Sequence, residues 1–179
     1  MALLVALSTT NQVSSQRKNT TMNSAQAMLE HGVTLADLRG ISGDELDALY
    51  QIAHADYTAG QYLSALAVAL QLVQHSPIEA RYQFLYALCL QQVGQLKSAL
   101  NHYAVAWALD RTNAALTFHM GECHAALGDL EAALGDLEAA TDAFEASFEL
   151  GRLHPDWREL QDLAEENIRS LRIDMASTV

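Results

Sequence analysis

Apolar and small residues recur along this chain at spacings of three and four, and glycines interrupt the pattern at a fixed period. Gly60, Gly94 and Gly128 are each separated by 34 residues. Each glycine is followed two positions later by tyrosine or leucine, and three positions beyond that by alanine. A 34-residue period with two helical segments per period is typical of tetratricopeptide repeats. We therefore expect an all-α fold, a tetratricopeptide-repeat solenoid.

The start and stop signals divide this pattern into three helix pairs with further helices at both ends. Thr34 with Asp37, and Ser42 with Glu45, have the spacing of a capping box and predict two helix starts. Solenoids need a terminal helix with one polar face, and the last apolar stripe fits one. The predicted segments are a disordered tail at 1–23, a single domain at 24–173, repeats at about 46–79, 80–113 and 114–154, a closing helix at 156–173, and a disordered end at 174–179.

The third repeat contains a duplication. GDLEAA occurs at 128–133 and again at 135–140, seven residues later, which is close to two helical turns. We expect a turn at Gly128, followed by a second helix that is one heptad longer than its counterparts. Either Leu137 or Phe144 then fills the large apolar position of that helix, and the aromatic side chain favours Phe144.

Charge and cysteine content narrow the class of partner. The formal net charge is −12, so a basic face for nucleic acid is missing and stable association with an anionic membrane is disfavoured. Cys89 and Cys123 lie 34 residues apart, at equivalent repeat positions, which favours two parallel packing sites over a disulfide.

The opening MALLVALSTT lacks the charge and cleavage pattern of a secretion signal, and both Met1 and Met22 are open as the start. We expect reduced thiols in a cytoplasm.

The first helix of each pair should line the concave side of such a stack. Positions three or four apart on these helices share one face. An open groove with aromatic, apolar and a few polar side chains suits an extended peptide. The predicted groove residues are Tyr50, His54, Tyr57, Arg81, Phe84, Leu88, Gln91, Phe118 and Glu122.

Motifs for catalysis or cofactor binding are missing from the sequence. It contains no P-loop, no G-x-G-x-x-G, no G-x-S-x-G and no H-E-x-x-H. His119 and His124 are five residues apart, about 140° around a helix, and cannot readily share a metal ion. We therefore expect no cofactor, no metal and no enzymatic activity.

Three runs carry a resemblance to a known family: ISGDELDALYQIAHADYTAGQYLSALAV, ARYQFLYALCLQQVGQLKSALNHYAVAWALD and FHMGECHAALGDLEAA. They resemble the class II chaperones of bacterial type III secretion, over a region from about Met28 to Leu171. The resemblance implies a cytoplasmic chaperone, often a homodimer, that keeps hydrophobic translocator proteins soluble. It also implies a groove for an extended client segment of the proline-x-leucine-x-x-proline kind. Tyr50 and Tyr57 match family groove aromatics, whereas His54 stands where the family often has phenylalanine.

A second class of function fits the same repeats. A tetratricopeptide scaffold or regulatory adaptor of another assembly system would hold a folded partner and would not protect a hydrophobic client. Co-expression with a client separates the two, because only a chaperone converts an insoluble translocator into a soluble complex.

Overall fold

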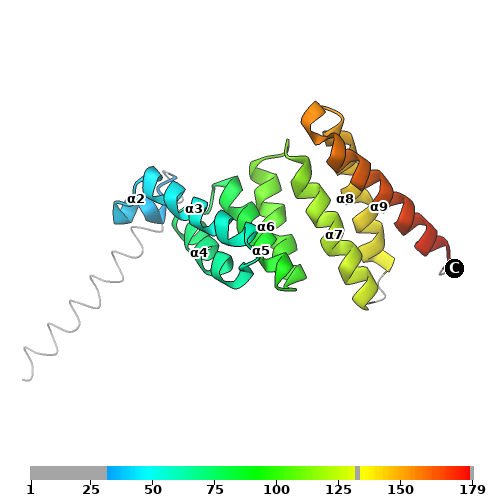
Figure 1. Ribbon diagram of the computed structural model, residues 1–179, viewed down its shortest axis with the longest axis horizontal. Coiled ribbons are helices and arrows are strands. Elements are labelled where there is room, and N and C mark those ends of the chain that lie inside the picture. Colours follow the sequence, from blue (N-terminus) through cyan, green and yellow to red (C-terminus); the bar gives the residue numbers. More distant parts are fainter. Residues whose placement is uncertain (1–31, 132–133, 178–179) are drawn as a thin grey trace, which may run out of the picture. The chain divides into compact units, whose positions relative to one another are not determined.

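The computed structural model describes residues 32–131 and 134–177 (Figure 1). The chain divides into two units, Met1–Glu45 and Leu46–Val179, and each is described by itself. The predicted tail at 1–23 and the first residues of the predicted domain, 24–31, lie outside the described residues. At the other end, the expectation of disorder from residue 174 is wrong for 174–177, because the last helix continues to Ser177.

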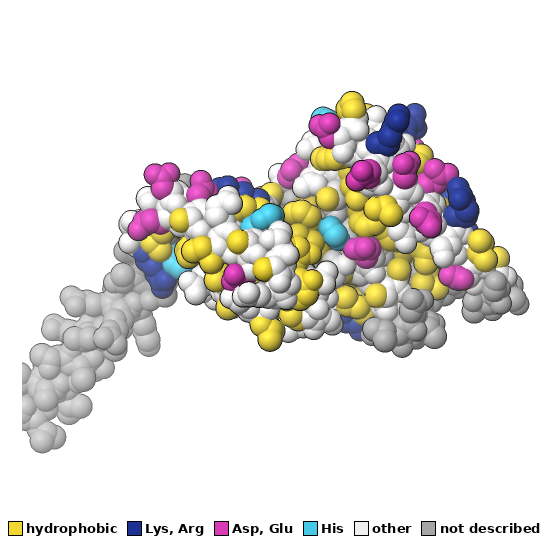
Figure 2. Space-filling model, viewed as in Figure 1, with side chains coloured by type: hydrophobic (Ala, Val, Ile, Leu, Met, Phe, Trp, Pro, Cys, Tyr) yellow, Lys and Arg dark blue, Asp and Glu magenta, His cyan; other side chains and the backbone are white. Residues whose placement is uncertain are grey.

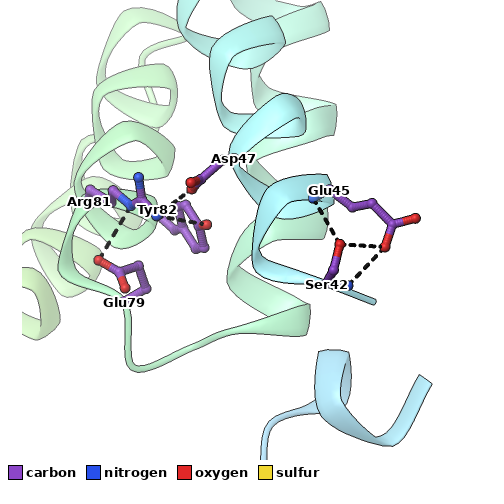
Figure 3. A network of polar contacts seen from close by, with 6 residues as sticks. All are labelled: Ser42, Glu45, Asp47, Glu79, Arg81 and Tyr82. Carbon is purple, nitrogen blue, oxygen red and sulfur yellow. Dashed lines mark hydrogen bonds and ion pairs between the residues drawn. The ribbon is translucent and has the colours of Figure 1, made fainter. Parts of the chain in front are cut away.

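The described part of the first unit contains the two predicted helix starts. In α2 (Leu35–Arg39), the Thr34 hydroxyl accepts the backbone N–H of Asp37, and the Asp37 carboxylate accepts the backbone N–H of Thr34 at 2.7 Å. Ser42 and Glu45 repeat the arrangement at the start of α3 (Gly43–Thr58), as Figure 3 shows. Both capping boxes are confirmed, and each satisfies N–H groups that the first turn of a helix leaves unpaired.

Helices α3 to α9 follow the predicted order, and the described residues contain no strand. Each helix from α4 to α8 packs against the next one along the chain, as the successive colours in Figure 1 show. The bounds after α3 are α4 (Tyr62–His75), α5 (Ala80–Gln92), α6 (Leu96–Leu109), α7 (Ala114–Glu131), α8 (Leu134–Gly151), the 3-10 turn η1 (Pro155–Trp157) and α9 (Arg158–Ser177).

Two of the three periodic glycines end helices as predicted. Gly60 and Gly94 have φ values of 75° and 79°, in the left-handed region that favours glycine. The N–H of the residue after each glycine then reaches back to a carbonyl in the last turn: Gln61 to Asp56 and Gln95 to Leu90. This geometry closes a helix and reverses the chain within a few residues.

The prediction of a turn at Gly128 is wrong. Gly128 lies inside α7, and the helix continues to Glu131. Consequently α7 and α8 have 18 residues each, whereas α5 and α6 have 13 and 14. The extra heptad is therefore divided between both helices of the third pair. A Cβ on Gly128 would lie 2.7 Å from Cγ of Leu137, so the glycine permits the two helices to approach.

Two hydrophobic clusters form the core of the second unit. The first lies around α5, α6 and α7, where Ala87 and Ala99 are both fully buried, as small residues at a close helix crossing should be. The second joins α7 and α8 to α9 through Ala140, Phe144, Ala164, Ile168 and Leu171. Phe144 is 1% exposed and Leu137 is only partly buried, which confirms Phe144 in the large apolar position. The closing helix buries one apolar stripe in this cluster, through Ala164, Ile168 and Leu171.

Candidate functional site

The predicted groove residues come from α3, α5 and α7, the first helices of the three pairs. Most of them are partly exposed: His54 and Arg81 are exposed, and Tyr50, Tyr57, Phe84, Leu88, Gln91 and Glu122 are half-buried. Direct contacts join three pairs of them, namely Tyr50 with His54, Arg81 with Tyr50, and Gln91 with Glu122.

Phe118 is a correction to the predicted set. Its side chain is 6% exposed and packs edge-on against Phe144, with ring centroids 5.3 Å apart. The heptad extension puts a large aromatic residue of α8 opposite this position, so Phe118 belongs to the core between α7 and α8. Its ring also meets the edge of His119, at 5.7 Å, and thereby supports a residue that is itself partly exposed.

At the α3 end, Arg81 joins two helices through charge and ring contacts (Figure 3). Its guanidinium lies 2.6 Å from Asp47 Oδ1 of α3 and 3.5 Å from Glu79 Oε1. It also lies 5.3 Å from the ring centroid of Tyr50 and 4.9 Å from that of Tyr82. Such contacts are favourable cation–π arrangements. The charge of Arg81 is therefore already matched within the chain.

At the α7 end, a polar network is set into the apolar surroundings. Gln91 Nε2 donates to Glu122 Oε2 at 2.9 Å, and His119 Nδ1 lies 2.7 Å from the same oxygen. The Tyr103 hydroxyl donates to Gln91 Oε1. We call these four residues the Glu122 network. Figure 2 shows acidic and histidine side chains among hydrophobic ones on one face of the molecule.

The electrostatics of the Glu122 network favour an ionised carboxylate. Burial alone would raise the pKa of Glu122, but the hydrogen bonds from His119 and Gln91 and the attraction of His119 outweigh it, and the pKa lies below its ordinary value. Burial raises the pKa of Tyr103 strongly, so this phenol stays protonated and donates. The carboxylate of Glu122 is therefore ionised at neutral pH.

Sequence reasoning missed two members of this network. His119 was considered only as a possible metal ligand, and Tyr103 was not among the predicted site residues. The spacing of His119 and Glu122, three apart on one helix, was the available signal for their contact. The residues that the structure describes contain no group of three or more side chains suited to hold a metal ion.

Pockets elsewhere in the second unit do not involve the predicted groove residues. One of about 520 Å³ lies along α9, between Glu165 and Ala176, and another of about 520 Å³ follows α8 around Arg152 and His154. A third, of about 340 Å³, surrounds the turn at Gly60 and Tyr62.

None of the helices within the described ranges is both long enough and apolar enough to cross a bilayer.

Comparison with known proteins gives matches in sequence and in structure. No family model matches the chain. Low calcium response locus protein H of Yersinia pestis is 31% identical over 98 residues, which are 55% of this chain and 58% of that protein. The same protein of Yersinia pseudotuberculosis matches equally. The match thus spans less than two thirds of these relatives.

Three solved structures are similar over most of their length. A type III secretion complex from Aeromonas hydrophila has 27% identity and a TM-score of 0.78, covering 86% of this chain and 98% of the other. The type III secretion translocator chaperone SycD of Yersinia enterocolitica has 26% identity and a TM-score of 0.67, covering 76% and 97%. PcrH in complex with the chaperone binding region of PopD has 26% identity and a TM-score of 0.70, also covering 76% and 97%. The structural neighbours of this chain are therefore type III secretion translocator chaperones.

Proposed function

We propose that this chain is a chaperone for the hydrophobic translocator proteins of a type III secretion system. It binds an extended client segment along the exposed faces of α3, α5 and α7 and keeps the client soluble in the bacterial cytoplasm before export. The observation that carries this proposal is the likeness to PcrH, whose structure contains the chaperone binding region of PopD. That likeness covers 97% of the PcrH chain and 76% of this one.

The residues along these helices suit such a client. The aromatic side chains of Tyr50, Tyr57 and Phe84 offer apolar area with few rotatable bonds. Gln91 and Glu122 offer polar groups that can satisfy the backbone of an extended chain. A client that later inserts into a membrane has apolar segments that aggregate when they are exposed to water. Covering such segments with a carrier of net charge −12 favours a soluble complex.

The proposal includes a homodimer as the resting form and requires no nucleotide. Exposed apolar side chains outside the predicted groove residues, among them Ile52 and Leu63, leave surface for a second copy. Sedimentation of the purified chain alone and with client measures whether a dimer exists and whether the client displaces it.

Co-expression tests the function directly. The translocator proteins of the bacterium that encodes this chain are produced with and without the chain, and their soluble fraction is measured. We expect the chain to move most of the translocator into the soluble fraction and to co-purify with it. A translocator that stays insoluble, with the chain abundant and folded, would favour a scaffold that holds folded partners.

Paired variants locate the binding surface. Tyr50→Ala with Tyr57→Ala should lower client binding at least about tenfold, because aromatic anchors dominate such interfaces. The matched control is Ile78→Ala with Leu153→Ala, which removes two large side chains that are 61% and 71% exposed, outside the predicted groove residues. Far-ultraviolet circular dichroism confirms that both variants stay helical. Equal loss of binding in both variants would contradict the assignment of the surface.

A further inference from the structure

Glu122 has one carboxylate oxygen that the chain does not use. Both hydrogen bonds that the structure gives this carboxylate end on Oε2, from Gln91 and from His119. Among the described residues, none donates to Oε1. The side chain is 39% exposed, so part of it remains within reach of a ligand.

The rest of the network prevents the carboxylate from turning away. The Tyr103 hydroxyl donates to Gln91 Oε1, which fixes the orientation of the amide so that its nitrogen points to Glu122. The His119 ring lies parallel to that of Tyr103, with an interplanar angle of 9° and centroids 5.9 Å apart. Because each member is held by another, the position of Oε1 is set before a client arrives. A preorganised acceptor loses little entropy on binding.

A client that covers this position has to replace the water on the carboxylate. Leaving an ionised carboxylate without donors in a dry interface costs several kcal/mol. An apolar client side chain over Glu122 would incur this cost, whereas a cationic one would compensate it. The hydrogen bonds to Oε2 lower the pKa of Glu122, which keeps its charge in place at neutral pH.

The surroundings of Glu122 suit the stem of a basic side chain as well as its charge. The ring of His119 lies 5.8 Å from that of Phe84, and both are half-buried. Tyr57 of α3 lies close enough to Glu122 for the carboxylate to affect its pKa, although burial has the larger effect. Lysine and arginine pack their apolar stems along such surfaces and place the charge beside an anion.

Two other carboxylates near the predicted groove residues are already matched. Asp47 and Glu79 both pair with Arg81, at 2.6 and 3.5 Å. Among the predicted groove residues, Glu122 is the one anion, and its partner His119 belongs to the same helix. The recognition of a client charge is therefore concentrated at the α7 end.

We propose that Glu122 selects clients that carry a lysine or arginine at the position that docks between α5 and α7, through a contact of that side chain with Oε1. This inference rests on the proposed function, since it assumes that an extended client binds along α3, α5 and α7. It adds a charge requirement to a surface that the aromatic residues alone would make selective only for apolar segments.

A peptide array tests the inference. The probes are overlapping peptides that span the chaperone binding region of PopD, with each position replaced in turn by lysine, acetyl-lysine or methionine. Binding is measured to the full wild-type chain, to Glu122→Gln, and to Glu159→Gln. The last variant makes the same change in net charge at an exposed position on α9.

The wild-type chain should prefer lysine at one position by about tenfold over methionine and over acetyl-lysine, as close charge pairs in interfaces do. Glu122→Gln should reduce that preference to within about twofold, and Glu159→Gln should leave it unchanged. Acetyl-lysine probes the charge on the wild-type chain, so the test holds even where Glu122→Gln unfolds. Peptides that bind without any lysine preference, or with a preference that Glu122→Gln keeps, would overturn this inference and leave the proposed function standing. Failure of every peptide to bind the folded wild-type chain would overturn this inference, and the co-expression test would then decide the proposed function by itself.

Discussion

Gly121 of α7 faces the ring of Phe144 of α8 without room for a side chain. A Cβ at Gly121 would lie 2.8 Å from two ring carbons, closer than real Cβ contacts come. The ring is 1% exposed and part of the second core cluster, so it has nowhere to move. This contact sets how closely the two longest helices of the repeats approach.

Gly121→Ala should therefore destabilise the protein by about 1–3 kcal/mol, the usual cost of overpacking a close-packed core. Urea unfolding followed by circular dichroism measures the change. The matched control is Gly43→Ala in the first turn of α3, where a Cβ meets no atom within 4 Å. That variant should be neutral or slightly stabilising, because alanine favours a helix over glycine. Phe144→Leu in the Gly121→Ala background should recover part of the loss, and a Gly121→Ala protein as stable as wild type would contradict this packing.

The two cysteines should be unreactive while the protein is folded. Both are fully buried, and burial raises the pKa of Cys89 to about 11. Burial, with a smaller effect of the Glu122 charge, raises that of Cys123 to about 12. At pH 8, roughly one Cys89 thiol in a thousand is then ionised, and only the thiolate reacts with iodoacetamide.

Alkylation followed by mass spectrometry checks this prediction. The folded chain should stay largely unlabelled under conditions in which the urea-unfolded chain is labelled fully. Cys89→Ser and Cys123→Ser variants show which of the two thiols accounts for any alkylation of the folded chain. Rapid labelling of either cysteine in the folded wild-type protein would show that its pocket opens easily.

The Glu122 network should make stability depend on pH in the acid range. The folded pKa of Glu122 lies below its ordinary value, so the carboxylate contributes stability above about pH 4.3, the value expected for an unfolded glutamate. That contribution disappears as the pH falls further, through the folded pKa. At neutral pH, Glu122→Gln should cost about 1 kcal/mol, a modest figure because the side chain is partly exposed.

Other carboxylates titrate over the same range, so the informative quantity is the difference between wild type and Glu122→Gln. We expect this difference in free energy of unfolding to be smaller below about pH 4 than at pH 5. Urea unfolding at low protein concentration avoids precipitation near the pI of about 4.8. A difference that grows on acidification would mean that the network stabilises the protonated carboxyl.

Local signals in the sequence determined the elements of this protein. The capping pairs Thr34–Asp37 and Ser42–Glu45, and the left-handed glycines at 60 and 94, act within a few residues of backbone, so their outcome does not depend on distant contacts. The alanines at 87 and 99 and the stripe of α9 follow from helical periodicity, which also decides which face is buried. The fold class, the repeat order and most helix ends could be read from these patterns alone.

Tertiary packing decided the helix ends, the burial and the contacts that the local sequence patterns did not determine. Gly128 has the spacing of a turn, but the duplicated heptad lengthens both helices of its pair, and Leu137 packs against it inside a continuous α7. The same lengthening brings Phe144 onto Phe118 and takes that ring from the predicted surface into the core. Gln91, Tyr103 and Glu122 come from three different helices, so their hydrogen bonds exist only once those helices have packed. Periodicity identifies the face of a helix, whereas the contacts between faces depend on distances that only the assembled stack sets.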